Sequence, residues 1–255
     1  MEPILTERRD GILRIEFNRP EKKNAITAAM YAVIADALTG AERDAGVRVI
    51  LLHGNFAGFT AGNDLQDFLA NPPRNEHAPA FRFLAAMRDA SKPVIAALSG
   101  PAVGVGTTML FHCDLIYAAP DTRFSLPFVN LALCPEAGSS YLLPRLAGYQ
   151  RAAELLLLGE PFSAERAREI GLVNEIVPSE SLLEHALGVA RKLVAKPAAA
   201  LRVTKSLMKQ AIAERVCSVM AVETTAFGVR LDSPEAKEAF TAFLEKRQPD
   251  FSKFA

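Results

Sequence analysis

The stretch KPVIAALSGPAVGVGTT, residues 92–108, decides the fold of this chain. Residues 93–98 are almost entirely apolar, which is typical of a strand covered on both faces in a parallel sheet. A turn signal follows at residues 99–101, and residues 107–113 are predicted to begin a buried helix. A strand, a glycine-rich turn and a helix N-terminus leave backbone N–H groups unpaired in front of the positive end of a helix dipole. Such an arrangement binds an anion or stabilises an oxygen that becomes negative during a reaction.

The glycines of this stretch do not identify a site by themselves. Gly100, Gly104 and Gly106 follow the pattern G-x-x-x-G-x-G. That pattern is not a dinucleotide fingerprint, and it is not a P-loop because no Gly-Lys-Ser/Thr follows. Close packing of the backbone explains the three glycines equally well, so further motifs are needed.

The composition narrows the class of protein. The 255 residues are half apolar, enough for one large domain with a sizeable core. With 29 basic and 29 acidic residues the formal net charge is zero, which argues against nucleic acid or a membrane surface as the main partner. Cys113, Cys134 and Cys217 are odd in number and far apart, as expected in a reducing compartment. The N-terminus has no apolar signal core and no run reaches transmembrane length, so a cytoplasmic protein is expected.

Strand and helix patterns alternate in the first part of the chain. Alternating apolar residues predict a strand over 11–17, and helical spacing predicts a helix over 26–44 with Thr27 as its N-cap. The other predicted strands cover 47–52, 114–119, 122–125 and 173–177. The other predicted helices of this part cover 81–88, 141–158 with a break near Gly148, 163–171 with Ser163 as its cap, and 181–195. From there on only helices are predicted, over 197–213, 216–230 and 233–246. This order predicts an α/β core over residues 1–195 and a helical region over residues 196–255.

A second glycine-rich loop, HGNFAGFTAGNDL over residues 53–65, also follows a buried strand. Two such loops can aim backbone N–H groups at one oxygen and form an oxyanion hole. A carbonyl held in this way becomes an enolate when a base removes its α proton. Glu136, among the small residues of LCPEAGSS, is the carboxylate best placed for that role, although most loop glutamates are merely solvated.

Four segments together resemble the enoyl-CoA hydratase/isomerase (crotonase) superfamily. FTAGNDLQDF at 59–68 and SGPAVGVGTTMLFHCDLIYA at 99–118 look like its two oxyanion-hole segments. FNRPEKKNAIT at 17–27 and PFVNLALCPEAGSSYLLPRLAG at 127–148 match as well, so the resemblance covers essentially the whole chain. It implies an α/β fold of the ClpP/crotonase type, a spiral of ββα units with a C-terminal helical trimerisation region. It also implies a homotrimer or a dimer of trimers acting on an acyl-CoA thioester, with coenzyme A as part of the substrate and no separate cofactor or metal.

The resemblance also implies roles for individual residues. Asn63 and Val105 would supply the two N–H groups of the oxyanion hole. The positions that match substrate-binding positions are Lys23, Ala25, Ala61, Gly62, Asp64, Leu65, Gly104 and Lys246. For the phosphates of coenzyme A the candidates are Lys22 and Lys23, with Lys246 or Arg247, for which a neighbouring subunit is one source.

The departures from the family pattern carry more information than the match. Hydratases of the family use two glutamates, and motif spacing puts Thr108 and Phe128 at those positions here. Neither residue can act as a general base for water, so hydration is not expected. Glu136 instead falls where the peroxisomal-type Δ3,Δ2-enoyl-CoA isomerases keep one catalytic glutamate. The resemblance therefore implies a 1,3-proton shift, with one carboxylate taking a proton from C2 and returning it to C4.

Three other functions stay open from the sequence. One is a ring-modifying isomerase of the 1,2-epoxyphenylacetyl-CoA type, another a hydratase-like protein, and the third a non-catalytic acyl-CoA-binding subunit. Acyl chain length, cis or trans preference and pathway are not specified. The phenylalanines between the motifs are expected to be ordinary core rather than pocket; they are Phe56, Phe59, Phe68, Phe81 and Phe83.

Overall fold

The computed structural model describes residues 2–73 and 76–254. Its largest sheet has six strands in the order β1-β2-β3-β4-β6-β9, and every neighbouring pair is parallel except β1 and β2. These strands are β1 (Ile4–Arg9), β2 (Ile12–Phe17), β3 (Val49–His53), β4 (Val94–Leu98), β6 (Leu115–Ala118) and β9 (Glu175–Ile176). A second sheet joins β5 (Pro101–Val103), β7 (Arg123–Ser125) and β8 (Phe162–Ser163).

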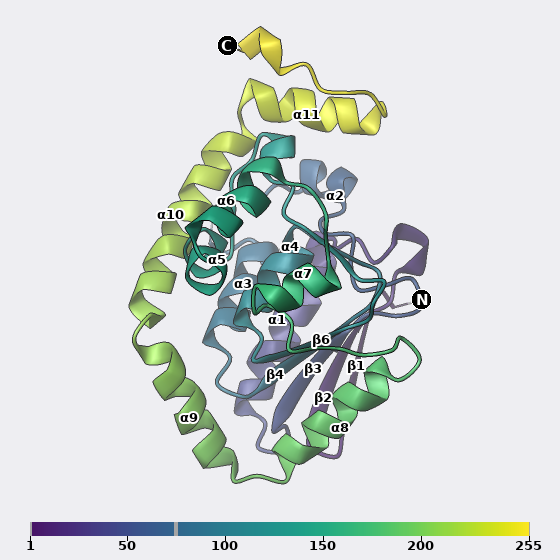
Figure 1. The fold of residues 1–255 in the computed structure, drawn as a ribbon, viewed down its shortest axis with the longest axis vertical. Helices are drawn as coiled ribbons and strands as arrows, with labels where there is room; N and C mark the ends of the chain where they lie inside the picture. The colour runs from purple at the N-terminus through teal and green to yellow at the C-terminus, as the bar shows by residue number, and fades with distance from the viewer. Residues whose placement is uncertain (1, 74–75, 255) are drawn as a thin grey trace.

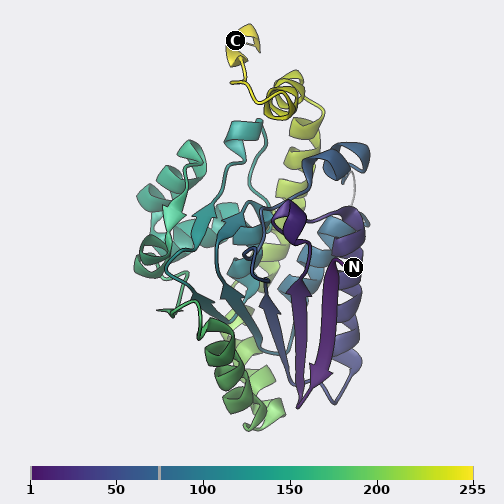
Figure 2. The ribbon, with the colours of Figure 1, turned by 90° about the vertical axis from the view of Figure 1, so that its right-hand side faces the viewer.

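The central strands β3 and β4 are buried along their whole length, as the apolar runs predicted. Ile50 and Val94 face the main core, which includes buried residues of α1 (Ala28–Arg43) and α3 (Pro79–Asp89). Side chains of the opposite face pack against α8 (Leu182–Val194). Figures 1 and 2 show the sheet between these two layers of helices.

The order of elements confirms the α/β fold class. β4 in the large sheet leads directly to β5 in the small sheet and then to α4 (Val105–Thr108). β6 and β7 repeat this step, and the next helical segment is η3 (Val129–Leu131). Each ββα unit thus moves the chain from one sheet to the other and back.

The helical segment predicted to start in residues 107–113 begins two residues earlier, at Val105, and ends before the predicted strand. α4 has four residues and passes into the 3-10 turn η2 (Met109–His112). The chain turns back here because Asp114 anchors the next strand beside β4: its N–H donates to the Val94 carbonyl at 2.8 Å, and its carboxylate accepts from the Val94 N–H at 2.7 Å. A longer helix would carry the chain past the edge where β6 pairs.

The remaining helices follow the predicted pattern closely. Thr27 caps α1 by accepting from the Met30 N–H, and Ser163 and Ser233 cap α7 and α11 in the same way. Their bounds, with those of the helices not yet given, are η1 (Pro20–Lys22), α2 (Leu65–Ala70), α5 (Ser139–Ala147), α6 (Tyr149–Leu158), α7 (Ala164–Glu169), α9 (Ala198–Gln210), α10 (Ala213–Leu231), α11 (Pro234–Leu244) and η4 (Phe251–Phe254).

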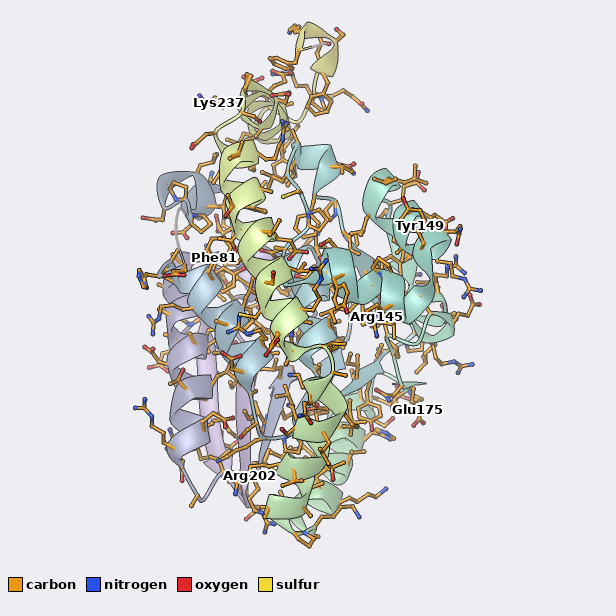
Figure 3. The ribbon with its side chains drawn as sticks, turned by 90° about the vertical axis from the view of Figure 1, so that its left-hand side faces the viewer. Phe81, Arg145, Tyr149, Glu175, Arg202 and Lys237 are labelled. Carbon is orange, nitrogen blue, oxygen red and sulfur yellow. The ribbon has the colours of Figure 1, made fainter. Side chains whose placement is uncertain are left out.

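The C-terminal helices form an arm along one side of the molecule. α9 and α10 run up that side and α11 crosses the far end of the core (Figure 1). In Figure 3, α10 passes between Phe81 of α3 and Arg145 of α5. Within residues 2–73 and 76–254, no helix combines the length and apolarity needed to cross a membrane.

Candidate active site

Thr60 holds together the two glycine-rich loops, which follow the neighbouring strands β3 and β4. Its N–H donates to the Pro101 carbonyl at 2.9 Å, and its carbonyl accepts from the Val103 N–H at 3.1 Å. Gly62 then passes so close to the other loop that a Cβ would lie 2.7 Å from the Val103 carbonyl oxygen. Its φ of +84° is also in the left-handed region that favours glycine. The sequence AGN therefore lets the second glycine-rich loop lie directly against the first.

Asn63 and Val105 each present a free backbone N–H where the two glycine-rich loops lie against each other, here called the crossing of the two loops. The carbonyl of Gly62 and the N–H of Asp64 both pair with Ile26, so the N–H of Asn63 between them faces the other way. Val105 is the first residue of α4, where a helix leaves its N–H groups unpaired. Among the described residues, neither N–H has a hydrogen-bond acceptor.

Both residues lie in the wall of one pocket of about 320 Å³. Four further predicted substrate-binding residues lie in the same wall: Ala61, Gly62, Leu65 and Gly104. The rest is mainly apolar and includes five phenylalanines, Phe68, Phe128, Phe227, Phe240 and Phe243. The structure therefore brings most of the predicted loop residues to one apolar cavity.

The other predicted binding residues of the N-terminal part support these loops from behind. Asp64 caps α2 by accepting from two backbone N–H groups, and it pairs with Arg19 at 2.7 Å. Burial, the largest single influence, would raise the pKa of Asp64, but the hydrogen bonds from Arg19 and from the α2 backbone, together with the Arg19 charge, outweigh it and the pKa is lowered. The Lys23 carbonyl accepts from the Ala61 N–H at 2.9 Å, and the Ala25 carbonyl accepts from Arg19 at 3.0 Å.

Of the two C-terminal candidates, Arg247 rather than Lys246 lies in the pocket wall. Lys246 is exposed in a left-handed backbone conformation just after α11. The Arg247 guanidinium contacts Glu238 at 2.6 Å and Glu245 at 2.6 Å.

Glu136 is buried and is not one of the residues of the pocket wall, although Leu133 of the same loop is. Burial raises its pKa to about 7, although the hydrogen bond from the Thr108 hydroxyl to Oε1, 3.2 Å long, acts in the opposite direction. Its other oxygen, Oε2, has no hydrogen-bond partner among the described residues and is not sealed from solvent. A buried carboxyl with a pKa near neutrality and one open oxygen suits a group that accepts and returns a proton.

Tyr31 of α1 supports the second loop. Its hydroxyl donates to the Asn63 side-chain oxygen at 2.5 Å. Burial, and then the negative charge of Glu136, raise the pKa of Tyr31, so it stays a neutral donor. No sequence motif singled out Tyr31, because its place beside Asn63 depends on how α1 packs.

His112 supports the Glu136 loop. Its Nε2 lies 2.7 Å from the Ala137 carbonyl oxygen, and burial lowers its pKa to about 4. It is therefore neutral at physiological pH and donates to that carbonyl. In the described part of the chain, no group of three or more His, Cys, Asp or Glu residues could hold a metal ion.

The comparison with known sequences decides the family. A sequence model described as enoyl-CoA hydratase/isomerase matches residues 7–253. The chain belongs to the enoyl-CoA hydratase/isomerase family. The crotonase superfamily resemblance of the four motifs is thereby confirmed, and an isomerase- or hydratase-type activity on acyl-CoA thioesters follows from membership.

Relatives within the family include several kinds of isomerase. A 1,2-epoxyphenylacetyl-CoA isomerase of Escherichia coli (strain K12) is 35% identical over 262 residues, covering 99% of this chain and 99% of the relative. An enoyl-CoA delta isomerase 2 of Rattus norvegicus is 36% identical over 251 residues, covering 96% of this chain and 64% of the relative. Among solved structures, OdaA of Pseudomonas aeruginosa is 47% identical with a TM-score of 0.93, covering 96% of this chain and 99% of that one. The α/β crotonase-like fold is therefore shared along nearly the whole chain.

The phenylalanines are distributed differently from the expectation. Phe59 and Phe83 are fully buried core, as expected, but Phe68 belongs to the pocket wall. Phe56 is 91% exposed, because it lies in the short loop at residues 54–58 rather than in an element that packs. The three phenylalanines of α10 and α11 in the wall had no motif to mark them.

Proposed function

We propose that this family member is an enoyl-CoA isomerase that moves a double bond from C3 to C2 of the acyl chain. The observation that carries the proposal is Glu136, a buried carboxyl with a pKa raised to about 7. The positions of the two hydratase glutamates hold Thr108 and Phe128, which have no carboxylate to activate water. One acid/base group is sufficient for a proton shift and insufficient for the hydratase mechanism.

In the proposed mechanism the Glu136 carboxylate removes a proton from C2 of the bound thioester. The electrons move toward the carbonyl, and the resulting dienolate oxygen is held by the N–H groups of Asn63 and Val105. Loss of one such donor typically costs about 3–4 kcal/mol in the barrier. The protonated Glu136 then returns the proton to C4, which leaves the double bond conjugated with the thioester.

Coenzyme A enters this proposal as part of the substrate. Ala61, Gly62, Leu65 and Gly104 of the wall would contact the pantetheine arm, with Lys23, Ala25 and Asp64 shaping the loop behind them. Lys22 and Lys23 are exposed near this loop and remain candidates for binding the phosphates of coenzyme A. Lys246 and Arg247 of the C-terminal region are candidates as well.

The test supplies the purified protein with a 3-enoyl-CoA and, separately, with a 2-enoyl-CoA. We expect the first to become a conjugated 2-enoyl thioester of unchanged mass, detected by ultraviolet absorbance and chromatography. We expect no addition of water to the second. Glu136→Gln should bind the thioester normally and lose turnover, which would exclude a binding-only subunit. Hydration of the 2-enoyl-CoA by the wild type would overturn the isomerase assignment.

The aromatic wall favours a second candidate, a ring-modifying isomerase. Five phenylalanines around one cavity suit a cyclic acyl group, because aromatic rings pack well against one another. The similarity to the Escherichia coli 1,2-epoxyphenylacetyl-CoA isomerase points the same way. Turnover of a phenylacetyl-derived epoxide thioester in preference to a linear 3-enoyl-CoA would select this alternative.

We also propose that the C-terminal region joins three subunits, or two sets of three. α9 and α10 carry exposed apolar side chains that a partner subunit could cover, namely Val203, Leu207, Met208, Val222 and Val229. Native mass spectrometry of the purified protein measures this directly, and a stable monomer at micromolar concentration would contradict it.

A further inference from the structure

A carboxylate from the C-terminal arm reaches the loop that carries Glu136. Glu223 of α10 is buried, and its Oε2 accepts from the Gly138 N–H at 2.6 Å. Its Oε1 accepts from the Ser140 N–H at 2.9 Å and from the Ser140 hydroxyl at 2.5 Å. We propose that Glu223 is a positioning residue for Glu136, holding its loop in place and setting a negative charge beside it. The inference rests on the proposed function, in which Glu136 is the acid/base group.

The interaction takes the place of an ordinary helix cap. Gly138 is the N-cap of α5 and has no side chain to cap it, so the first N–H groups of the helix need another acceptor. Glu223 supplies it from a distant part of the chain, and the positive end of the helix dipole favours its charge. Among the described residues, Glu223 has no lysine or arginine partner, so backbone and hydroxyl donors alone stabilise it.

The Glu136 loop needs such support because its backbone is strained. Ala132 and Ala137 both have left-handed φ angles, 56° and 60°. This backbone conformation is unfavourable for alanine, because its Cβ crowds the following carbonyl oxygen. α10 holds the loop at both ends, since Arg230 donates to the Ala132 carbonyl at 3.0 Å while Glu223 binds beyond Ala137.

Glu223 also brings a second carboxyl group close enough for its negative charge to act on Glu136. The other titratable or polar groups around Glu136 include Tyr31 from α1, Thr108 from α4, His112 from η2, Cys134 from its own loop and Ser139 from α5. His112 is neutral because its pKa is about 4, and burial raises the pKa of Cys134 to about 11. Burial raises the pKa of Glu223 as well, against the hydrogen bonds from Ser140 and Gly138 that favour its carboxylate form. In that form its negative charge adds to burial in raising the pKa of Glu136.

The test is Glu223→Gln, which keeps the size of the side chain and removes its charge. The Glu136 titration is followed by NMR with glutamate 13C-labelled at the side-chain carboxyl, its signal assigned by its loss in Glu136→Gln. We expect the midpoint, about 7 in the wild type, to move to lower pH in the variant. In isomerase assays the low-pH limb of kcat should move in the same direction. The plateau of kcat should fall by roughly 10- to 100-fold with little change in KM, because the base is displaced.

Glu214→Gln is the matched control, because Glu214 is an exposed glutamate of the same helix. It should leave both the titration and kcat unchanged. An unchanged Glu136 midpoint in folded Glu223→Gln would overturn the inference. The NMR readout needs no turnover, so failure of the proposed function would appear separately as absent isomerase activity in the wild type.

Ser140→Ala provides a second test that does not depend on the folding of Glu223→Gln. It removes the hydroxyl bond and keeps the charge of Glu223. We expect kcat to fall severalfold, with KM and the low-pH limb unchanged. A wild-type kcat in this variant would contradict the positioning role.

Discussion

At the scale of single residues, the raised pKa of Glu136 suits proton transfer but lowers the stability of the folded protein when the carboxyl ionises. Its pKa is about 7 in the folded protein and near its ordinary value of 4.5 in the unfolded chain. The folded protein therefore binds this proton more tightly, and stability falls as the pH rises from about 4.5 to about 7. The difference between the two pKa values corresponds to a loss of roughly 3 kcal/mol in the free energy of unfolding. This full loss is reached once Glu136 is fully ionised.

Glu136→Gln should separate activity from stability. We expect it to lower kcat by roughly 10²–10⁴-fold, because the acid/base group is gone. It should also be more stable than the wild type by up to about 3 kcal/mol at about pH 8, and by far less at about pH 5. Urea unfolding at both pH values measures the difference, with Glu214→Gln as the control. An equal stability difference at both pH values would show that ionisation of Glu136 is not its cause.

The sequence identified Glu136 and the two loop residues from their motifs, but not the groups that tune them. Thr108 was identified only as a substituted glutamate, and the structure adds its hydrogen bond to Glu136. Tyr31 lies about a hundred residues before Glu136 in the sequence, and Glu223 lies somewhat fewer residues after it. No local sequence pattern marks either residue. Their roles depend on side-chain contacts between distant segments, which periodicity and motif spacing do not describe.

At the scale of elements, the site depends on two loops packed backbone against backbone. Gly62→Ala should destabilise the protein by about 2–4 kcal/mol, because a Cβ meets the Val103 carbonyl and the φ is left-handed. It should also lower kcat, since Val103 and Val105 lie on the same short segment.

Gly188→Ala in α8 is the matched control. A Cβ there meets nothing within 4 Å, and alanine favours a helix interior. It should stabilise the protein by about 0.5–1 kcal/mol and leave kcat unchanged. Thermal unfolding compares the two variants, and equal melting temperatures would contradict the proposed packing constraint.

Most strands and helices could be predicted from apolar periodicity, and the exceptions have physical reasons. β1 was missed because it is an exposed edge strand in which only Ile4 is buried. The Asp10-Gly11 pair was the available signal, since both residues have positive φ in the tight turn to β2. The beginning of β5 was interpreted as part of a turn. Its three residues pair with β7 in the second sheet, and that pairing leaves no pattern in the sequence.

At the scale of the whole molecule, the C-terminal arm completes the pocket that the core begins. Phe243→Ala should raise KM for an acyl-CoA substrate about fivefold, because it removes an apolar contact from the wall. Phe243 is 59% exposed, so the variant should fold with nearly wild-type stability. Phe56→Ala, which removes an exposed ring outside the wall, is the control. An equal KM for both variants would contradict a role for α11 in binding.

The helices of this arm could be predicted, but their contact with the pocket could not. Phe240 lies near Phe68 of α2 in the fold, with ring centroids 6.2 Å apart, although the sequence separates them by most of the chain. Such a contact depends on the direction in which α10 and α11 leave the core. The predicted boundary after residue 195 and the trimer stay predictions.

The bonds of Thr60 have a consequence for hydrogen exchange. The amides of Thr60 and Val103 are paired in the crossing of the two loops, whereas those of Asn63 and Val105 are unpaired beside the pocket. Protected and rapidly exchanging amides should therefore alternate within a few residues, without any local unfolding. A bound thioester should slow the exchange of Asn63 and Val105 and leave that of Thr60 and Val103 as it was. The rapid exchange of these two amides would then reflect a rigid site open to its ligand, and not a flexible loop.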